Sequence, residues 1–88
     1  MYYVYVLKST KDKNLYTGYT EDLKKRFKEH NAQRVSSTRH RAPLKLIYYE
    51  VCHSQYDALD RERYLKTAMG KRYIKNRLKH FFQKTTDE

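Results

Sequence analysis

The sequence has a single cysteine and no long apolar run. Its one cysteine, Cys52, can form no internal disulfide, and only the adjacent His53 stands at zinc-ligand spacing. This favours a reducing cytoplasm and argues against metal held by thiolates. No segment approaches the ~18 apolar residues of a membrane span, and no basic region followed by an apolar run opens the chain. We therefore expect a soluble, unexported protein.

Acidic residues are scarce relative to basic ones. The 88 residues include 20 Lys and Arg against 10 Asp and Glu, which gives a formal charge of +10. Because 39% of the residues are hydrophobic, the chain should fold rather than form a disordered basic tail. This length predicts one domain with a small core, at residues 1–82, and a flexible tail at 83–88. The charge predicts a polyanionic partner.

The order of apolar and polar segments predicts an α+β fold, a small three-stranded antiparallel sheet flanked by about three helices. The expected elements are strands at 2–7, about 15–19 and 44–52, and helices from the N-cap Thr20 to about 31, from Ser54 to about Gly70, and at 71–82. The first strand is continuously apolar, so it should be central, and a short connection makes it a hairpin with the second. In the expected register Tyr5 faces Tyr16. Tyr3 then faces Gly18.

The first helix combines apolar residues with two polar candidates. A helical wheel puts Leu23, Phe27 and His30 in one stripe, with Arg26 at its edge. Arg26 and His30 are thus neighbours that face partly inward. Taken alone, they favour a structural interpretation, with arginine methylenes over the core and a half-buried imidazole.

A carboxylate, Glu62, falls on the buried face of the second helix. The apolar residues around it are Ala58, Leu59, Leu65 and Met69. A buried ionised carboxylate needs a cation, a metal or strong donors beside it. An ion pair with Arg26 or Lys66 would meet this need. So would Mg²⁺, which needs only one or two protein carboxylates because it keeps its waters and binds substrate phosphate.

A metal beside tyrosines and an arginine would suit phosphodiester hydrolysis. The arginine would stabilise the transition state, and Tyr16 or Tyr5 would position or deprotonate the attacking water. A tyrosine base requires nearby cations that depress its pKa. The alternative is packing, because the chain has ten tyrosines and tyrosine is a common strand residue.

Two basic clusters predict contact with a phosphate backbone. One lies in the loop at 32–43 and the other on the third helix; their members are Arg34, Arg39, His40 and Arg41, and Lys71, Arg72, Lys75, Arg77 and Lys79. A solvated cationic face is the alternative, but the third helix has no acidic residue to balance its charge. We therefore favour nucleic acid. No recognition-helix pattern or zinc-finger spacing indicates sequence reading.

These residues occur in an order that resembles the GIY-YIG nuclease superfamily over nearly the whole chain. The resemblance rests on Tyr3-Val4-Tyr5, Tyr16-Thr17-Gly18, Arg26, His30 and Glu62. Small stand-alone bacterial members are most similar, since they share the metal-helix pattern seen here at Ala58, Arg61-Glu62 and Leu65-Lys66. Two positions depart from larger relatives. Tyr3 replaces the first glycine of the name-giving motif, and Tyr19 stands where some members have a lysine.

The resemblance implies a role for each site residue. It makes Tyr16 the general base with Tyr5 as its hydrogen-bonding companion, Arg26 the phosphate clamp, His30 an auxiliary polar group, and Glu62 the ligand of one Mg²⁺ or Mn²⁺. Gly18 would allow close backbone approach. Asn76 and Lys66 are auxiliary candidates, Asn76 because many relatives have a late asparagine near the metal.

The implied function is metal-dependent endonuclease cleavage of nucleic acid, with DNA favoured, in a process such as DNA repair or recombination. We expect a monomer or weak homodimer, no membrane partner and no small-molecule cofactor. A nuclease-like fold that binds nucleic acid without turnover is the alternative. A cationic structural protein ranks last, because it leaves the inward Glu62 unexplained.

Overall fold

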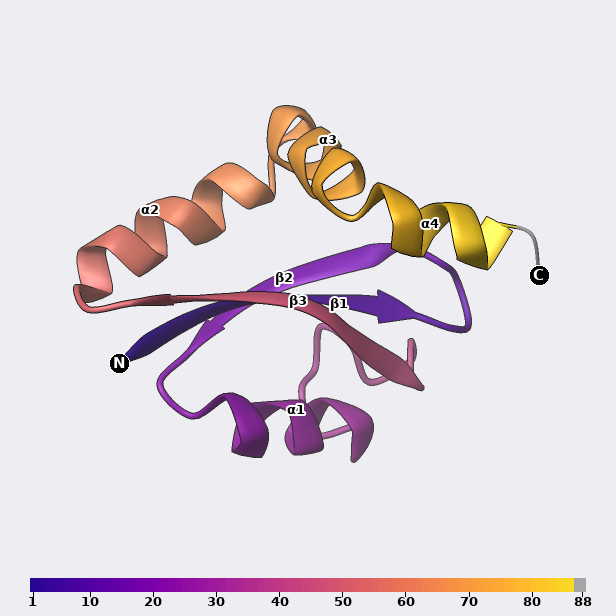
Figure 1. Cartoon of the computed structure of the whole chain (residues 1–88). Helices are drawn as coiled ribbons and strands as arrows, with labels where there is room; N and C mark the ends of the chain where they lie inside the picture. The colour runs from indigo at the N-terminus through magenta and orange to yellow at the C-terminus, as the bar shows by residue number, and fades with distance from the viewer. Residues whose placement is uncertain (87–88) are drawn as a thin grey trace.

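The computed structural model, which describes residues 1–86, is a three-stranded antiparallel sheet with helices on both faces (Figure 1). The strands, in the order β2-β1-β3, are β1 (Tyr2–Ser9), β2 (Leu15–Thr20) and β3 (Leu44–Cys52). The helices are α1 (Leu23–Asn31), α2 (Gln55–Leu65), α3 (Ala68–Arg77) and α4 (Lys79–Thr86). The predicted α+β fold and the central first strand are confirmed. Within the described residues, no helix is both long and apolar enough to span a bilayer.

The hairpin register differs from the predicted one by two residues. Tyr5 pairs with Gly18, and Tyr16 pairs with Leu7. The predicted Tyr5–Tyr16 and Tyr3–Gly18 pairs are therefore wrong, because the turn is centred one residue later in the chain. A shift of two residues preserves the face on which each side chain lies, so the phenols of Tyr5 and Tyr16 still share a face.

Helix α1 begins later than predicted. Its N-cap is Asp22, whose carboxylate accepts a hydrogen bond from the backbone N–H of Lys25 at 3.1 Å. The predicted cap, Thr20, is the last residue of β2, and its hydroxyl oxygen accepts from the Asp22 N–H at 3.1 Å. The segment between β2 and α1 is thus a capped corner that fixes where the helix leaves the sheet.

The C-terminal half contains three helices where two were predicted. The helix expected from Ser54 to Gly70 ends at Leu65, because the hydroxyl of Thr67 accepts from the Gly70 N–H at 3.1 Å and caps a new helix. The helix expected at 71–82 is divided at Leu78.

These breaks also correct two smaller predictions. Met69, expected on the buried face of the second helix, lies in α3 and is 63% exposed. Residues 83–86, expected in a flexible tail, belong to α4. The rest of the predicted tail, residues 87 and 88, lies outside the described residues.

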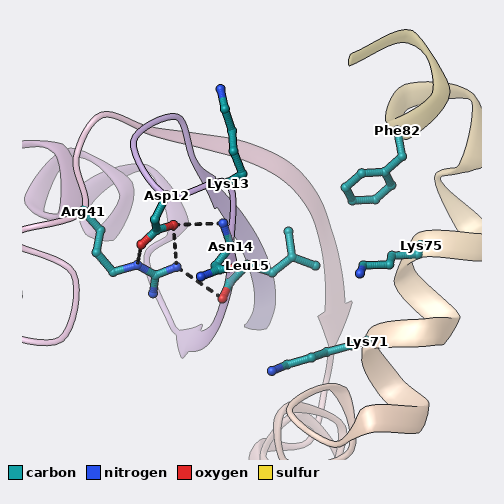
Figure 2. A pocket seen from close by; sticks show the side chains of 8 residues that line it. All are labelled: Asp12, Lys13, Asn14, Leu15, Arg41, Lys71, Lys75 and Phe82. Carbon is teal, nitrogen blue, oxygen red and sulfur yellow. Dashed lines mark hydrogen bonds and ion pairs between the residues drawn. The ribbon is translucent and has the colours of Figure 1, made fainter. Parts of the chain in front are cut away.

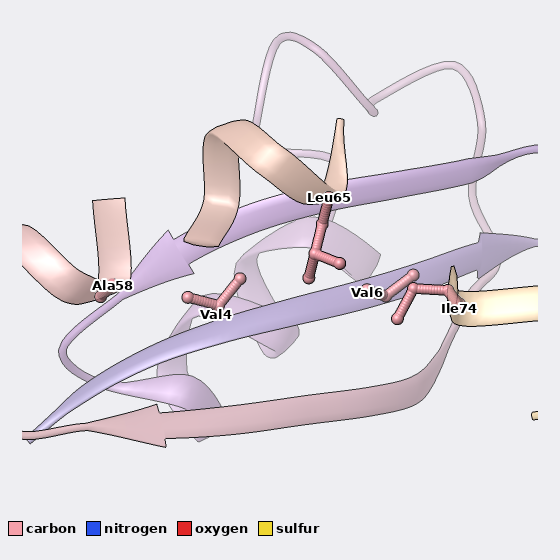
Figure 3. Close-up of a cluster of buried hydrophobic side chains, with 5 residues drawn as sticks. All are labelled: Val4, Val6, Ala58, Leu65 and Ile74. Atoms are coloured by element: carbon pink, nitrogen blue, oxygen red, sulfur yellow. The ribbon is translucent and has the colours of Figure 1, made fainter. Parts of the chain in front are cut away.

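The central strand β1 supplies side chains to an apolar layer on each face of the sheet. On the α2–α3 face lie Val4, Val6, Ala58, Leu65 and Ile74 (Figure 3). On the α1 face lie Tyr5, Leu7 and Leu44, with Leu23 and Phe27 packed against them. Burial on both faces explains why the strand is apolar at every position rather than at alternate ones. Tyr5 and Tyr16, with Arg26 and His30 of α1, lie on the α1 face, whereas the candidate metal ligand Glu62 belongs to α2 on the other face.

Gly70 of α3 packs directly against the backbone of α2. A Cβ atom at this position would overlap the carbonyl oxygen of Tyr64, which belongs to α2. Since a backbone atom has little freedom to move, we expect Gly70→Ala to lower the free energy of unfolding by about 2 kcal/mol, despite the better helix propensity of alanine. Chemical denaturation measures this change. The control Met69→Ala, at an exposed neighbour, should change stability by less than about 0.5 kcal/mol; equal effects would contradict the close packing.

Candidate active site

The site is built on the α1 face of the sheet, around the ring of Tyr5. Tyr5 is 1% exposed and lies directly over Gly18 of the paired strand β2. A Cβ atom at residue 18 would overlap the ring carbon Cζ and the hydroxyl of Tyr5. Only glycine therefore leaves room for the phenol, whose hydroxyl reaches His30 of α1.

A chain of hydrogen bonds runs from Tyr5 into the protein. The Tyr5 hydroxyl lies 2.8 Å from Nε2 of His30, and Nδ1 of His30 lies 2.7 Å from the hydroxyl of Thr38. Both His30 and Thr38 are fully buried. A half-buried imidazole was expected for His30; it is instead fully enclosed, with Tyr5 of β1 bonded to one ring nitrogen and Thr38 of the following loop bonded to the other.

Burial keeps both Tyr5 and His30 neutral. It raises the pKa of Tyr5 to about 12, and it lowers the pKa of His30 to about 4 with help from the positive charge of Arg26. Arg26 acts on Tyr5 in the opposite direction, because its positive charge favours the ionised phenol, but burial outweighs it and the pKa of Tyr5 stays raised. A neutral imidazole donates from one ring nitrogen and accepts at the other, so His30 links the hydroxyls of Tyr5 and Thr38. His30 is thus a positioning group and not a cation.

The second phenol, Tyr16, lies nearer the surface. Its ring centroid is 5.2 Å from that of His30 and 6.5 Å from that of Tyr5. Its hydroxyl accepts a hydrogen bond from Ser37 at 3.3 Å, and the side chain is only partly buried. The two phenols therefore differ in environment, since Tyr5 is locked inside and Tyr16 is accessible to water.

Arg26 lies at the edge of this cluster. Its Nη1 donates to Oε1 of Glu29 at 3.2 Å, and its side chain is 39% exposed. It borders a cavity of about 370 Å³, which is also lined by Tyr19, Thr20, Glu21, Asp22, Lys25 and Glu29. The guanidinium thus stands between the buried phenol and an open cavity whose lining includes three carboxylates and a second cation, Lys25.

Glu62 comes from α2 and is half-buried, with 20% of its side chain exposed. Its Oε2 lies 3.2 Å from Nζ of Lys66, so the predicted pairing with Lys66 is present. Burial dominates the raised pKa of Tyr5, but the negative charge of Glu62 contributes to it, which places the carboxylate within electrostatic reach of the phenol.

The donor set at Glu62 fits a hard divalent cation. In the part of the chain that the structure describes, Oε1 of Glu62 has no hydrogen bond or ion pair, and no group of three or more His, Cys, Asp or Glu converges at Glu62 or anywhere else. One carboxylate oxygen completed by water and substrate oxygens is the arrangement that Mg²⁺ and Mn²⁺ accept.

The other predicted site residues lie farther out. Arg34 and Arg39 are exposed in the loop after α1, and Arg72 and Asn76 are exposed on α3. Within residues 1–86, no hydrogen bond joins Asn76 to Glu62, whose ion pair is with Lys66, or to the hydroxyls of Tyr5 and Tyr16. Arg41, Lys71 and Lys75, predicted in two separate clusters, line one cavity.

Ser37 and Thr38 contact the site and were not predicted to do so. The hydroxyl of Ser37 is hydrogen-bonded to the hydroxyl of Tyr16, and the hydroxyl of Thr38 is hydrogen-bonded to Nδ1 of His30. Their segment is rich in Ser, Thr and Arg, and that composition alone does not distinguish the one buried threonine from its exposed neighbours. The one sequence feature that points to Thr38 is that it is a short polar residue in the middle of the loop.

The depressed pKa of His30 predicts a loss of stability in mild acid. With a pKa of about 4 in the folded protein and about 6.5 in the unfolded chain, the unfolded state binds more protons between these values. Lowering the pH from about 6.5 to about 4 should therefore cost about 3 kcal/mol of stability through this group. Denaturation at several pH values measures the slope, which His30→Gln should reduce. The control is His53→Gln, at an exposed histidine; an unchanged slope in the His30 variant would contradict the assignment.

Comparisons with known proteins agree with this geometry. A family model described as the GIY-YIG catalytic domain matches residues 1–78. The chain is 51% identical over 65 residues to UPF0213 protein SpyM50708 of Streptococcus pyogenes serotype M5 and, equally, to UPF0213 protein SpyM3_1077 of serotype M3, covering 73% of this chain and 70% of each relative. No solved structure matches. By the extent of these matches, and with its phenols and imidazole on one face of the predicted fold, the chain belongs to the GIY-YIG family of nuclease domains.

Proposed function

We propose that this protein is a metal-dependent endonuclease that hydrolyses phosphodiester bonds in DNA with one Mg²⁺ or Mn²⁺ ion at Glu62. The observation that carries the proposal is the pair of unlike phenols, one sealed by Gly18 and His30 and the other open to water, beside a half-exposed arginine. A purely structural cluster would have no need to keep one phenol and the guanidinium accessible.

Tyr16 is the general base in this proposal. Acting as a phenolate, it would take a proton from the attacking water and become a phenol, and Ser37 donates a hydrogen bond to its oxygen. Tyr5 stays protonated because its pKa is about 12, so it orients its neighbours and does not accept a proton. Thr38 and His30 fix Tyr5 from behind.

Arg26 is the phosphate clamp. Its guanidinium offers a planar set of donors that can hold two phosphate oxygens and stabilise the negative charge of the transition state. The salt bridge to Glu29 is partly exposed and therefore weak, so a phosphate can compete for the guanidinium.

The bound divalent ion would neutralise phosphate charge and lower the pKa of a coordinated water. Glu62 would hold it through Oε1, with Lys66 fixing the other carboxylate oxygen. The exposed basic residues, among them Arg34, Arg39 and Arg72, would attract the DNA backbone without reading its sequence. A role in DNA repair or recombination, in a monomer or weak homodimer, is part of this proposal.

A binding module without turnover is the second candidate function. It is favoured by the ion pair between Glu62 and Lys66, which satisfies the carboxylate in the absence of a metal. This candidate predicts salt-dependent binding of nucleic acid and no cleavage under any conditions.

One experiment separates the two candidates. Purified protein is incubated with single-stranded, duplex and branched DNA and RNA, in Mg²⁺, in Mn²⁺ and in a chelator. Cleavage that requires the metal supports the nuclease, and absence of cleavage on every substrate with either metal overturns it. Binding measured in the chelator shows whether the second candidate survives.

A further inference from the structure

A second basic site lies on the other side of the edge strand from the phenols. A cavity of about 560 Å³ is formed where the β1–β2 turn meets α3 and α4. Figure 2 shows Lys71 and Lys75 extending from α3 towards the hairpin, with Phe82 of α4 above them and Arg41 on the opposite wall. Four cationic side chains and one carboxylate line the cavity; the residues are Asp12, Lys13, Asn14, Leu15, Arg41, Lys71, Lys75 and Phe82.

The carboxylate in this cavity is already neutralised. Nε of Arg41 donates to Oδ2 of Asp12 at 2.8 Å, and the Arg41 guanidinium holds the pKa of Asp12 below its usual range. By contrast, no ion pair is found for Lys13, Lys71 or Lys75 among the described residues. The cavity therefore keeps an excess of positive charge.

The wall opposite α3 is rigidly held. The Ser9 hydroxyl donates to the carbonyl oxygen of Arg41 at 2.6 Å and accepts from the N–H groups of Lys11 and Asp12, each at 3.1 Å. Nη2 of Arg41 also reaches the carbonyl oxygen of Leu15 at 3.5 Å. The turn and the loop are thus tied together before any ligand arrives, which reduces the entropy cost of binding.

We infer that this cavity binds a phosphate group of the nucleic-acid strand, one that lies beyond the phosphate to be cleaved. Lys71 and Lys75 lie one helical turn apart on the same face of α3, so their ammonium groups can share one phosphate or hold two adjacent ones. A phosphodiester suits the open and strongly cationic cavity. The partly buried ring of Phe82 can contact the sugar or base next to the bound phosphate.

The position of the cavity links it to the proposed catalytic centre. Leu15 lines the cavity, and the next residue, Tyr16, faces the opposite side of β2. Because β2 is an edge strand, a nucleic-acid strand that crosses this edge can contact both sites. This inference rests on the proposed function. It extends that function by requiring that the nucleic-acid strand continue past the cleaved bond to a second phosphate in the cavity.

A matched pair of double variants tests the site. Lys71→Gln with Lys75→Gln removes two charges from the cavity, and Lys24→Gln with Lys28→Gln removes two exposed charges that lie one helical turn apart on α1, outside the cavity. Affinity for a short fluorescent DNA strand is measured by anisotropy in a chelator at several salt concentrations. The cavity pair should weaken binding about tenfold or more and lower the salt slope by between one and two, whereas the control pair should change affinity less than about threefold. Equal effects of the two pairs would overturn the inference.

Competition with inorganic phosphate tests whether the cavity binds a phosphate of the nucleic-acid backbone or a free phosphate ion. If the cavity serves the nucleic-acid backbone, phosphate alone should displace the labelled strand only weakly, because it makes a fraction of the contacts. Tight binding of phosphate together with unchanged strand affinity in the Lys71 and Lys75 variant would assign the cavity to a free anion and overturn the inference.

Failure of this inference and failure of the proposed function are separable. Binding is measured without metal, so a cavity effect in a protein that never cleaves supports the inference and counts against the nuclease. Metal-dependent cleavage with no difference between the variant pairs supports the nuclease and overturns the inference. Thermal unfolding of each variant shows that these exposed substitutions leave the fold intact.

Discussion

Replacing Glu62 with alanine should lower the rate of Mg²⁺-dependent cleavage by about 10³-fold, while affinity for DNA in a chelator stays unchanged. A bound divalent ion contributes several kcal/mol of transition-state stabilisation, and each 1.36 kcal/mol corresponds to about a tenfold change in rate. Glu62 is the half-buried carboxylate within electrostatic reach of Tyr5, so its loss should remove the metal and leave the basic surface in place. Cleavage rates in Mg²⁺ and Mn²⁺ and anisotropy in the chelator measure the two effects.

The same helix supplies the control for this result. Asp60 is an exposed carboxylate on α2 that pairs with Arg63 at 3.3 Å, and Asp60→Ala should leave the cleavage rate within about twofold. Loss of the Glu62–Lys66 pair should cost less than about 1 kcal/mol of stability, because Lys66 is 55% exposed. If Glu62→Ala cleaves as fast as the unchanged protein while folded, Glu62 is not the metal ligand.

Much of the α1-face site could be predicted from the sequence because local patterns determine it. Because side chains alternate along a strand, Tyr16 and Gly18 lie on the same face of β2. A register shift of two residues relative to β1 leaves them on the face of Tyr5. The helical wheel placed His30 on the stripe that faces this strand. Full burial of His30 was not predicted, because it depends on Thr38 closing over the ring from a loop without periodicity.

The C-terminal helices were harder to predict, and for a different reason. Apolar residues continue at helical spacing past residue 65, so the pattern favours one long helix through Gly70. The break depends on one hydroxyl, that of Thr67, and on the close contact of Gly70 with α2. The cavity formed with Lys71 and Lys75 follows from this break, because the new direction of α3 brings both lysines to the β1–β2 turn.

Replacing Tyr16 with phenylalanine should lower the cleavage rate by about 10²–10⁴-fold, the usual contribution of general base catalysis, with little change in DNA affinity. The substitution removes one hydroxyl whose hydrogen bond among the described residues is with Ser37, so the fold should be retained. Tyr56→Phe, at a tyrosine that is 78% exposed, is the control and should have no effect. Single-turnover cleavage with saturating protein measures the chemical step separately from binding.

Comparison with Tyr5→Phe decides which phenol is the base. Tyr5 keeps its proton because its pKa is about 12, and its hydroxyl is bonded to buried His30, so its loss should lower stability by about 1–2 kcal/mol. Its effect on the single-turnover cleavage rate should therefore be smaller than that of Tyr16→Phe. A larger loss of rate in folded Tyr5→Phe than in folded Tyr16→Phe would assign the base to Tyr5 and reverse the roles of the buried and the accessible phenol.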